Sequence, residues 1–391
     1  AGFNIAYNDL RYDPDRDILL KELIYAAATD VFDLSTGPLL RAGLYQLEDN
    51  KWVFIYVMHH IITDGWSMNV LLRELLLVYE AYTKGQEDTL RPLRIQYKDY
   101  AVWQQQQMNK ATLAGQKAYW LKQFEGELPV LQLPADHLRP AIKTYKGGSV
   151  KKVISLQVSN DLRNIAQEHG GTLFMGLLSA VNMLLHNYTG QEDIVIGSPV
   201  AGREHIDLEG QIGFYVNTLA LRAQFKESNT YLELLEQVRQ VTLGAYEHQV
   251  YPFDKLVADL GLQGDSSRNN LFDVSLILQN AGPDMNGALH RLKGLSIAPY
   301  QQEGYELSKF DLTFFFIETP DGLQASIKYN TDLFSKDTIR QMLDNLEKML
   351  TEIAANPSIT IQQPGYSYSS PVTEHTADAG YSFKTAISDE F

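Results

Sequence analysis

Strand-like and helix-like apolar patterns alternate along most of this chain. Short apolar or alternating runs predict strands at residues 38–46, 51–58, 150–156, 194–197, 216–225, 272–279, 312–318 and 323–329. Apolar residues at helical spacing predict helices at 18–30, 68–84, 97–123, 161–169, 173–188, 231–248 and 335–355. Because helices that alternate with strands pack on sheets, we expect an α/β fold with mixed sheets.

The length and the prolines predict two lobes. The chain has 391 residues, and at roughly 100–200 residues per domain this gives two or three compact units. Residues 129–145 hold three prolines and little periodicity, which is typical of a connecting segment. We expect an N-terminal lobe at 1–128, a crossover at 129–147, a C-terminal lobe at 148–364 and a tail or linker at 365–391.

Composition excludes several classes of function. The 33 basic and 48 acidic residues give a net charge of −15, which argues against nucleic-acid binding because phosphate backbones need basic surfaces. The chain has no cysteine, so it forms no disulfide and uses no thiolate nucleophile. The longest clean apolar run, residues 53–58, is far too short to span a bilayer, and no basic-then-apolar leader opens the chain. We therefore expect a cytoplasmic protein with no membrane partner.

The strongest chemical signal is segment 58–67, MHHIITDGWS, where an apolar strand runs into a loop before a helix. Residues 53–58 are apolar on both faces, so we expect this strand at the centre of a sheet. Ser67 is expected to cap the helix that comes next. Loops in this position carry functional groups on a rigid scaffold.

The residues of this loop suit proton transfer. The imidazole of His59 or His60 exchanges protons near neutral pH. Asp64 is able to hold a ring or a neighbouring cation in place, and Gly65 permits backbone conformations that other residues resist.

Three other interpretations of these residues are weighed against proton transfer by a histidine. Metal binding by His59, His60 and Asp64 is awkward because adjacent residues leaving a strand point to opposite sides, and we expect no metal site. A purely structural histidine pair is an alternative when the loop is judged by residue type alone. A Ser-His-Asp triad needs an activated serine, and the chain has no Gly-x-Ser-x-Gly elbow.

The pattern His-His-x-x-x-Asp-Gly after a strand resembles the hallmark of condensation domains of nonribosomal peptide synthetases, which belong to the chloramphenicol acetyltransferase-like superfamily. Further segments resemble that family's in the same order, between residues 32 and 330: 97–103 (YKDYAVW), 197–203 (GSPVAGR), 212–218 (IGFYVNT), 248–254 (HQVYPFD) and 265–271 (DSSRNNL). The chain departs from the family at Tyr215, at Val250, where an acidic residue is usual, and at Asn270, where proline is usual.

The resemblance implies a fold and a reaction. The fold would be two chloramphenicol acetyltransferase-like lobes that form a V-shaped pseudo-dimer around a central tunnel. The reaction would be amide bond formation between two thioesters on the phosphopantetheine arms of donor and acceptor carrier domains. An adenylation domain would adjoin, and no cofactor would be bound directly. His60, the second histidine, would lie in the middle of the tunnel as the catalytic residue, either as a base or as a group that positions the amine.

Supporting roles are also implied by the resemblance. Asp64 would be structural and would pair with an arginine of the other lobe, for which Arg203 is the candidate. His59 would shape the loop, and Gly65 completes the motif.

Other residues of the similar segments are candidates for lining the tunnel, namely Trp66, Asn217 and Thr218. Packing is the simpler role for Trp66, and Pro252 is expected to fix a turn. Segment 97–103 is expected to be an aromatic helix face packed on the core.

The same segments indicate a subtype and leave rival functions open. Heterocyclising relatives replace the histidine pattern, silent relatives lose the second histidine, and epimerising relatives carry a later glutamate-rich segment, none of which is found here. The sequence of residues 62–67 is most similar to that of condensation domains that accept an L-configured donor. The alternatives are a non-catalytic module that docks carriers and a free-standing acyltransferase that uses coenzyme A thioesters.

Two segments that open family members have no match in this chain. They are a first helix motif and a stretch similar to Arg-His-Glu-x-Leu-Arg-Thr, and residues 3–34 match the family sequence that comes directly after that stretch. We therefore expect a first lobe that lacks its leading elements.

Overall fold

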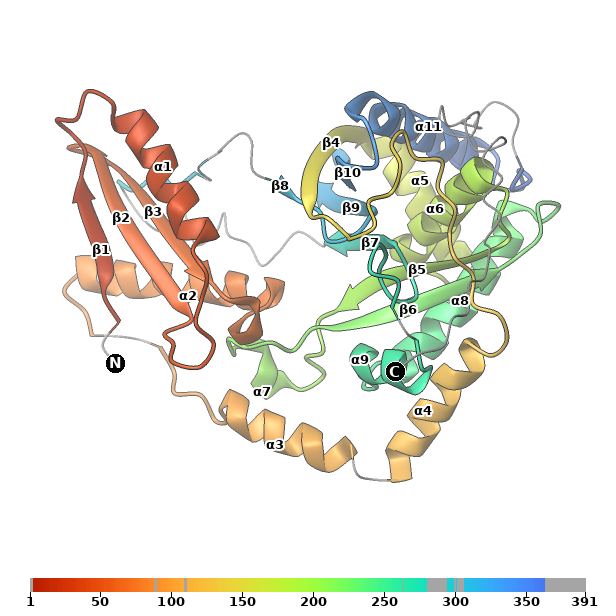
Figure 1. Cartoon of the computed structure of the whole chain (residues 1–391), viewed down its shortest axis with the longest axis horizontal. Coiled ribbons are helices and arrows are strands. Elements are labelled where there is room, and N and C mark those ends of the chain that lie inside the picture. Colours follow the sequence, from red (N-terminus) through yellow and green to blue (C-terminus); the bar gives the residue numbers. More distant parts are fainter. Residues whose placement is uncertain are drawn as a thin grey trace, which may run out of the picture.

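Two lobes of unequal size open away from each other in the computed structural model, which has the outline of a V (Figure 1). The structure describes residues 3–87, 90–108, 111–262, 264–279, 294–298, 300 and 306–362, so the predicted tail at 365–391 lies outside the described residues. Within these residues one lobe holds a sheet of three strands and the other a sheet of seven. Both sheets mix parallel and antiparallel pairs, so the predicted α/β class is confirmed.

The smaller sheet has the order β1 (Ile5–Asp9), β2 (Leu40–Glu48), β3 (Lys51–Met58). β1 is parallel to β2, and β3 is antiparallel to it. Helix α1 (Arg16–Thr29) covers one face of the sheet, and its Leu20 lies in a small core with Tyr45, Leu47 and Val53.

The prediction that residues 53–58 lie at a sheet centre is wrong. Among the described strands β2 is central and β3 is at the edge. Val53 is buried against the α1 side, whereas Phe54 on the opposite face is 40% exposed. The run is apolar on both faces because that second face carries aromatic side chains, among them Trp52, whose ring lies 6.0 Å from that of Tyr7. The apolar patterns also failed to predict β1.

The loop after β3 contains the short 3-10 helix η1 (His60–Ile62) and leads to α2 (Gly65–Thr83). Asp64 caps α2, because its Oδ1 accepts the backbone N–H of Ser67 at 2.8 Å. The expectation that Ser67 is the cap is therefore wrong. The helix starts before Ser67, and a carboxylate at position 64 satisfies its free N–H groups.

The helical region predicted at 97–123 consists of α3 (Tyr97–Met108) and α4 (Ala111–Gln123). Helix α3 runs beneath the gap between the lobes in Figure 1. Trp120 and Phe124, at the end of the chain segment expected in the N-terminal lobe, pack into the core of the C-terminal lobe. Trp120 Nε1 also donates to the carbonyl of His248 at 2.9 Å.

The larger sheet has the order β6-β5-β7-β9-β10-β4-β8, in which β5, β7 and β9 are parallel neighbours. The strands are β4 (Lys146–Ser155), β5 (Asp193–Val200), β6 (Asn217–Gln224), β7 (Val274–Gln279), β8 (Glu306–Leu307), β9 (Leu312–Thr319) and β10 (Gly322–Asn330). The helices are α5 (Leu156–Glu168), α6 (Leu173–Thr189), α7 (Ile206–Glu209), α8 (Tyr231–Glu247), α9 (Phe253–Asp259) and α11 (Lys336–Ala355). The longer elements confirm those predicted for this part of the chain, with shifted ends.

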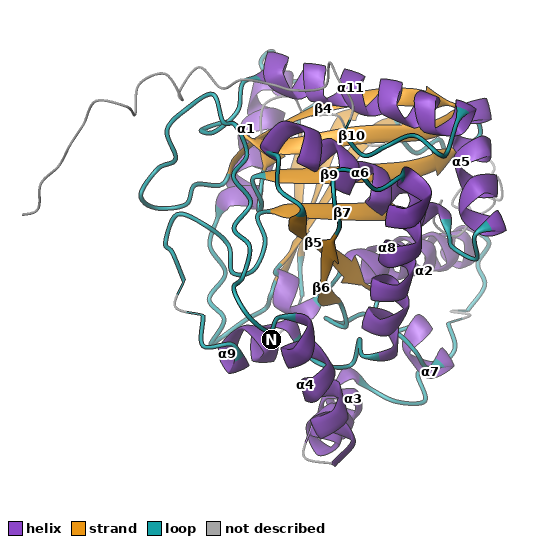
Figure 2. Cartoon of the chain, turned by 90° about the vertical axis from the view of Figure 1, so that its right-hand side faces the viewer, coloured by secondary structure: helices purple, strands orange, loops and turns teal. Residues whose placement is uncertain are grey.

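Helices α5, α6, α8 and α11 gather on one face of the larger sheet (Figure 2). Nearly every side chain of α6 is buried, which is why its sequence is apolar on all sides. Its neighbours bury only a stripe, as α11 does with residues from Ile339 to Ile353. No helix of the described residues is both long enough and apolar enough to cross a membrane.

Two ion pairs, each with a buried carboxylate and a partly buried arginine, attach the crossover to the larger sheet. Arg139 pairs with Asp311 at the start of β9, and Arg268 pairs with Asp273 before β7 at 2.7 Å. Arg268 also donates to the carbonyl of Leu131 at 3.1 Å. The connection between the lobes is thereby held in one position against the sheet.

Candidate active site

His59 and His60 are the first two residues after β3, and their Nδ1 atoms have opposite roles in hydrogen bonds: one accepts and the other donates. Nδ1 of His59 accepts the backbone N–H of Ile61 at 3.1 Å. Nδ1 of His60 lies 2.7 Å from the carbonyl oxygen of Thr63. A carbonyl only accepts, so His60 carries its proton on Nδ1, whereas a ring nitrogen that accepts an N–H carries none. The neutral rings are therefore opposite tautomers, and only His60 has a lone pair on Nε2.

The two rings also have different surroundings. The His59 ring lies edge-on to Phe32 with centroids 6.1 Å apart, and its backbone N–H donates to Leu39 at 3.0 Å. His60 is exposed, and its ring meets Phe214 of the other lobe edge-on with centroids 5.3 Å apart. His59 thus helps to shape the loop, while the exposed ring of His60 lies where the lobes meet.

Asp64 is buried and uses both carboxylate oxygens for structure. Its Oδ1 accepts from the N–H and the hydroxyl of Ser67, at 2.8 and 2.7 Å. Its Oδ2 accepts the backbone N–H of Tyr215 at 3.0 Å, and Arg203 Nη2 lies 3.1 Å from Oδ1. The expected ion pair with Arg203 is therefore present, and it joins the cap of α2 to the C-terminal lobe.

These contacts set the ionisation of Asp64. Burial by itself would raise the pKa of the carboxyl group, since it disfavours the charged form. The hydrogen bonds from Ser67 and from the Tyr215 N–H, together with the positive charge of Arg203, outweigh burial and hold the pKa of Asp64 below its ordinary value. Asp64 is thus a fixed anion near neutral pH, which suits a structural partner rather than a proton carrier.

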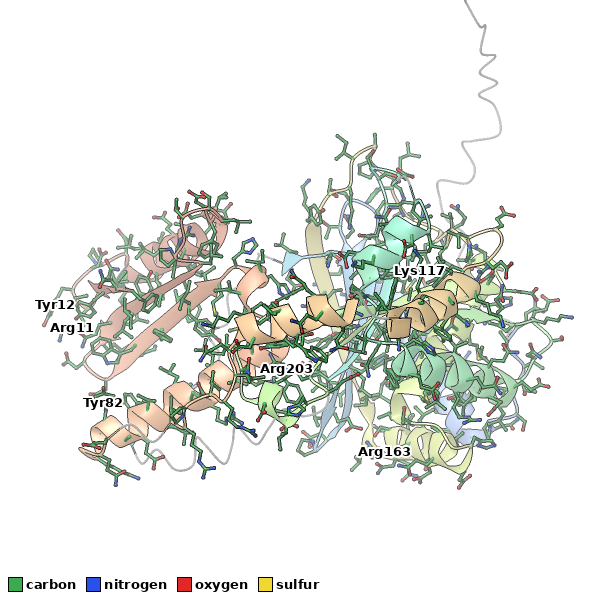
Figure 3. All side chains as sticks on the ribbon, turned by 90° about the horizontal axis from the view of Figure 1, so that it is seen from below. Arg11, Tyr12, Tyr82, Lys117, Arg163 and Arg203 are labelled. Atoms are coloured by element: carbon green, nitrogen blue, oxygen red, sulfur yellow. The ribbon has the colours of Figure 1, made fainter. Side chains whose placement is uncertain are left out.

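Arg203 is the centre of the junction between the lobes, where Figure 3 shows it. Its side chain is 1% exposed. Nη1 donates to the carbonyl of Gln211 at 2.8 Å and also to that of Leu208, while Nη2 donates to Ser67 Oγ at 2.8 Å. The guanidinium lies over the ring of Tyr215, 4.2 Å from its centroid. These contacts hold the 203–215 segment against the start of α2.

Ser67 has a role that its sequence position did not predict. Its hydroxyl is fully buried, donates to Asp64 Oδ1 and accepts the backbone N–H of Gly213 at 3.1 Å. Ser67 therefore connects the lobes. The resemblance of segment 212–218 to the family indicated that this loop has a role, but nothing in the segment indicated that Gly213 contacts Ser67.

The aromatic residues of α3 also hold this loop. The hydroxyl of Tyr97 donates to the carbonyl of Phe214 at 2.9 Å. The rings of Tyr97 and Tyr100 lie 5.2 and 4.7 Å from that of Tyr215, where burial raises the pKa of Tyr215 to about 12. Trp103 remains 49% exposed, so the expected aromatic face packs on the 211–215 loop only in part.

The candidates for lining the tunnel differ from one another. Trp66 is 45% exposed, and its Nε1 donates to the carbonyl of Glu209 at 2.8 Å. The amide of Asn217 is fully engaged: Nδ2 donates to the carbonyls of Gln249 and Tyr251, and Oδ1 accepts the N–H groups of Thr218 and Phe253. Asn217 therefore braces the turn that Pro252 enters and has no polar group left for a ligand.

Gly65 does not need the conformational freedom expected of it. It is the first residue of α2 and is not among the glycines with a positive φ. A Cβ built on it would meet no atom within 4 Å.

Within the described residues no group of three or more His, Asp or Glu side chains could hold a metal ion.

A family model and two known peptide synthases match most of this chain. The family model described as Condensation domain matches residues 2–370. Gramicidin S synthase 2 of Brevibacillus brevis is 40% identical over 357 residues, which are 91% of this chain and 8% of that protein. Bacitracin synthase 3 of Bacillus licheniformis is 42% identical over 361 residues, which are 92% of this chain and 5% of that protein. The chain thus spans only a small part of each relative.

Two solved structures have similar folds. The X-domain from teicoplanin biosynthesis has a TM-score of 0.78 and 25% identity, and the alignment covers 92% of this chain and 80% of that one. Holo-AB3403, a four-domain nonribosomal peptide synthetase bound to AMP and glycine, has a TM-score of 0.77 and 27% identity, with 92% and 28% of the two chains covered.

Proposed function

This chain belongs to the condensation domain family, and on that basis we propose that it forms a peptide bond between two thioesters in nonribosomal peptide synthesis. The observation that carries the proposal is the state of His60. The ring is exposed at the junction of the lobes, and its Nδ1 hydrogen bond to Thr63 leaves the lone pair on Nε2. The similarity to peptide synthases supports the same reaction class.

The chemistry suits one unprotonated imidazole nitrogen. The acceptor amine attacks the donor thioester carbon, a C–N bond forms, and the C–S bond breaks to release a thiol. The amine must lose a proton on the way, and the departing sulfur takes one up. Nε2 of His60 would accept the first proton or hold the amine in place for attack. Alignment of two tethered thioesters would supply much of the rate, so the base need not be strong.

The substrates in this proposal arrive on phosphopantetheine arms. Donor and acceptor carrier domains would present them from opposite faces of a tunnel between the lobes, and an adenylation domain would adjoin. The V-shaped outline and the position of His60 where the lobes meet support this delivery. The donor would be L-configured.

Asp64 and Arg203 act in this proposal by holding the lobes in register. Both side chains are at most 2% exposed, so neither reaches a substrate. The pair fixes the start of α2 and the 211–215 loop, and these two segments place His60 and Phe214 beside each other.

The test is a condensation assay with this chain and two loaded carriers. Mass spectrometry would follow the dipeptide on the acceptor carrier, with His60→Ala as the inactive comparison. Condensation predicts product only when both carriers are loaded. Turnover of soluble acyl-CoA with a free amine would instead assign a free-standing acyltransferase. Carrier binding without product from any pair of substrates would assign a docking module.

A further inference from the structure

Phe214 is a half-exposed aromatic ring that the C-terminal lobe places against His60 of the N-terminal lobe. The ring centroids are 5.3 Å apart and the ring planes cross at 82°. Phe214 is 40% exposed, whereas its neighbours Gly213 and Tyr215 are buried. The ring of Phe214 thus lies directly beside the imidazole of His60.

The backbone around Phe214 is held on three sides. Ser67 Oγ accepts the N–H of Gly213, the hydroxyl of Tyr97 donates to the carbonyl of Phe214, and Asp64 accepts the N–H of Tyr215. A Cβ on Gly213 would lie 2.4 Å from the ring of Tyr97, so Gly213 and Tyr97 are packed too closely to admit another atom between them. Because these contacts hold the backbone of Phe214 in place, its ring cannot move away with the backbone when a larger substrate binds. We call this ring the Phe214 wall.

The acceptor side chain is the substrate group that meets this wall first. A general base works across roughly 2.6–3.2 Å, so the acceptor amine lies next to Nε2 of His60 during attack. The side chain of the acceptor branches from the carbon bonded to that amine. The side chain of the donor is one bond farther away, beyond the thioester carbonyl.

We propose that Phe214 is a specificity-determining residue that limits the size of the acceptor side chain beside His60. The inference rests on the proposed condensation reaction and adds a substrate preference to it. Phe214→Ala would enlarge the space beside His60 and admit acceptors with bulky side chains. Phe214→Trp would reduce that space and favour a glycyl acceptor. Small changes in a tight apolar pocket alter discrimination by roughly 10–200-fold.

The experiment measures kcat/KM for leucyl and glycyl acceptor carriers with one common donor carrier. We expect the leucine-to-glycine ratio to rise by roughly tenfold or more in Phe214→Ala and to fall by a similar factor in Phe214→Trp. Phe54→Ala is the matched control, because Phe54 is also 40% exposed but lies on β3, where its ring contacts Tyr56. Its ratio should equal that of the unaltered chain.

The outcomes separate the two proposals. A ratio that moves in opposite directions in the two variants supports the inference. Equal loss of rate with both acceptors would show that Phe214 only steadies His60, and an unchanged ratio would show no role in selection; either result overturns it. If the unaltered chain makes no product with either acceptor, the condensation function itself fails and the inference falls with it. Should Phe214→Ala be insoluble, Phe214→Leu gives the same comparison with a smaller expected change.

Discussion

Adjacent histidines His59 and His60 are held in opposite tautomers by two hydrogen bonds of opposite sense. Ile61 donates its N–H to Nδ1 of His59, and Nδ1 of His60 donates to the carbonyl of Thr63. The second of two similar side chains is thereby left with the lone pair that a proton acceptor needs. This difference explains in physical terms why the pair has one catalytic candidate.

The tautomers are directly measurable. At a pH where both rings are neutral, nitrogen NMR should show the proton of His60 on Nδ1 and that of His59 on Nε2. His248, whose Nδ1 lies 2.7 Å from the carbonyl of Gly244, should match His60 and serves as an internal reference. The same tautomer in His59 and His60 would contradict the assignment.

Replacing His60 should remove most of the activity and leave the fold intact. His60→Ala is expected to lower the condensation rate by about 10²–10⁴-fold, the usual contribution of a general base. The ring is exposed, so the free energy of unfolding should change little. His137→Ala, at an exposed position of the crossover, is the control and should retain full rate. Near-normal turnover of the His60 variant would remove the residue from the mechanism.

The ion pair between Asp64 and Arg203 should matter for stability. Arg203→Ala leaves a buried carboxylate without its cation, so the free energy of unfolding should drop by about 3–5 kcal/mol. Arg94→Ala is the control, because Arg94 pairs with Asp207 while 79% exposed and should contribute under about 1 kcal/mol. Chemical denaturation measures both. Equal losses in the two variants would show that burial does not strengthen the Arg203 pair.

Stability should depend on the ionisation of Asp64 at acid pH. The pKa of Asp64 is lowered from 3.8 in the folded chain, so its contribution is complete above that pH and is lost as the pH falls through the folded-state pKa. Unfolding of the unaltered chain and of Asp64→Asn should be compared between pH 7 and pH 3. The difference in free energy should be constant near neutrality and should shrink below about pH 4. A difference that stays constant to the lowest pH would show that the charge of Asp64 contributes nothing.

Gly213 should tolerate no side chain. Its Cβ would lie 2.4 Å from the ring of Tyr97 and 2.7 Å from that of Tyr215, so Gly213→Ala must displace α3 or the 211–215 loop. We expect a loss of about 1–3 kcal/mol in unfolding free energy. Gly115→Ala in α4, where a Cβ meets nothing within 4 Å, should instead stabilise the chain by up to about 1 kcal/mol. Equal effects at the two glycines would contradict the close contact.

The sequence by itself determined the features that depend on neighbours along the chain. Apolar periodicity predicted most strands and helices, because side-chain spacing along one element decides which face is buried. The strand, loop and helix around residues 58–67 were recognisable for the same reason, and the hydrogen bond of His60 to Thr63 spans only three residues. The family-like segments then supplied Arg203 as the partner of Asp64.

Only the tertiary structure decided the contacts between distant segments. Ser67 meets Gly213 across 146 positions and Asp64 meets Tyr215 across 151, and no local pattern encodes either contact. The edge position of β3 depends on which strands pair with β2, not on the apolar run within β3. Phe214 reaches His60 because the two lobes share buried hydrogen bonds at Asp64 and Ser67. Packing of one lobe on the other therefore creates the surroundings of a histidine that the sequence had already made visible.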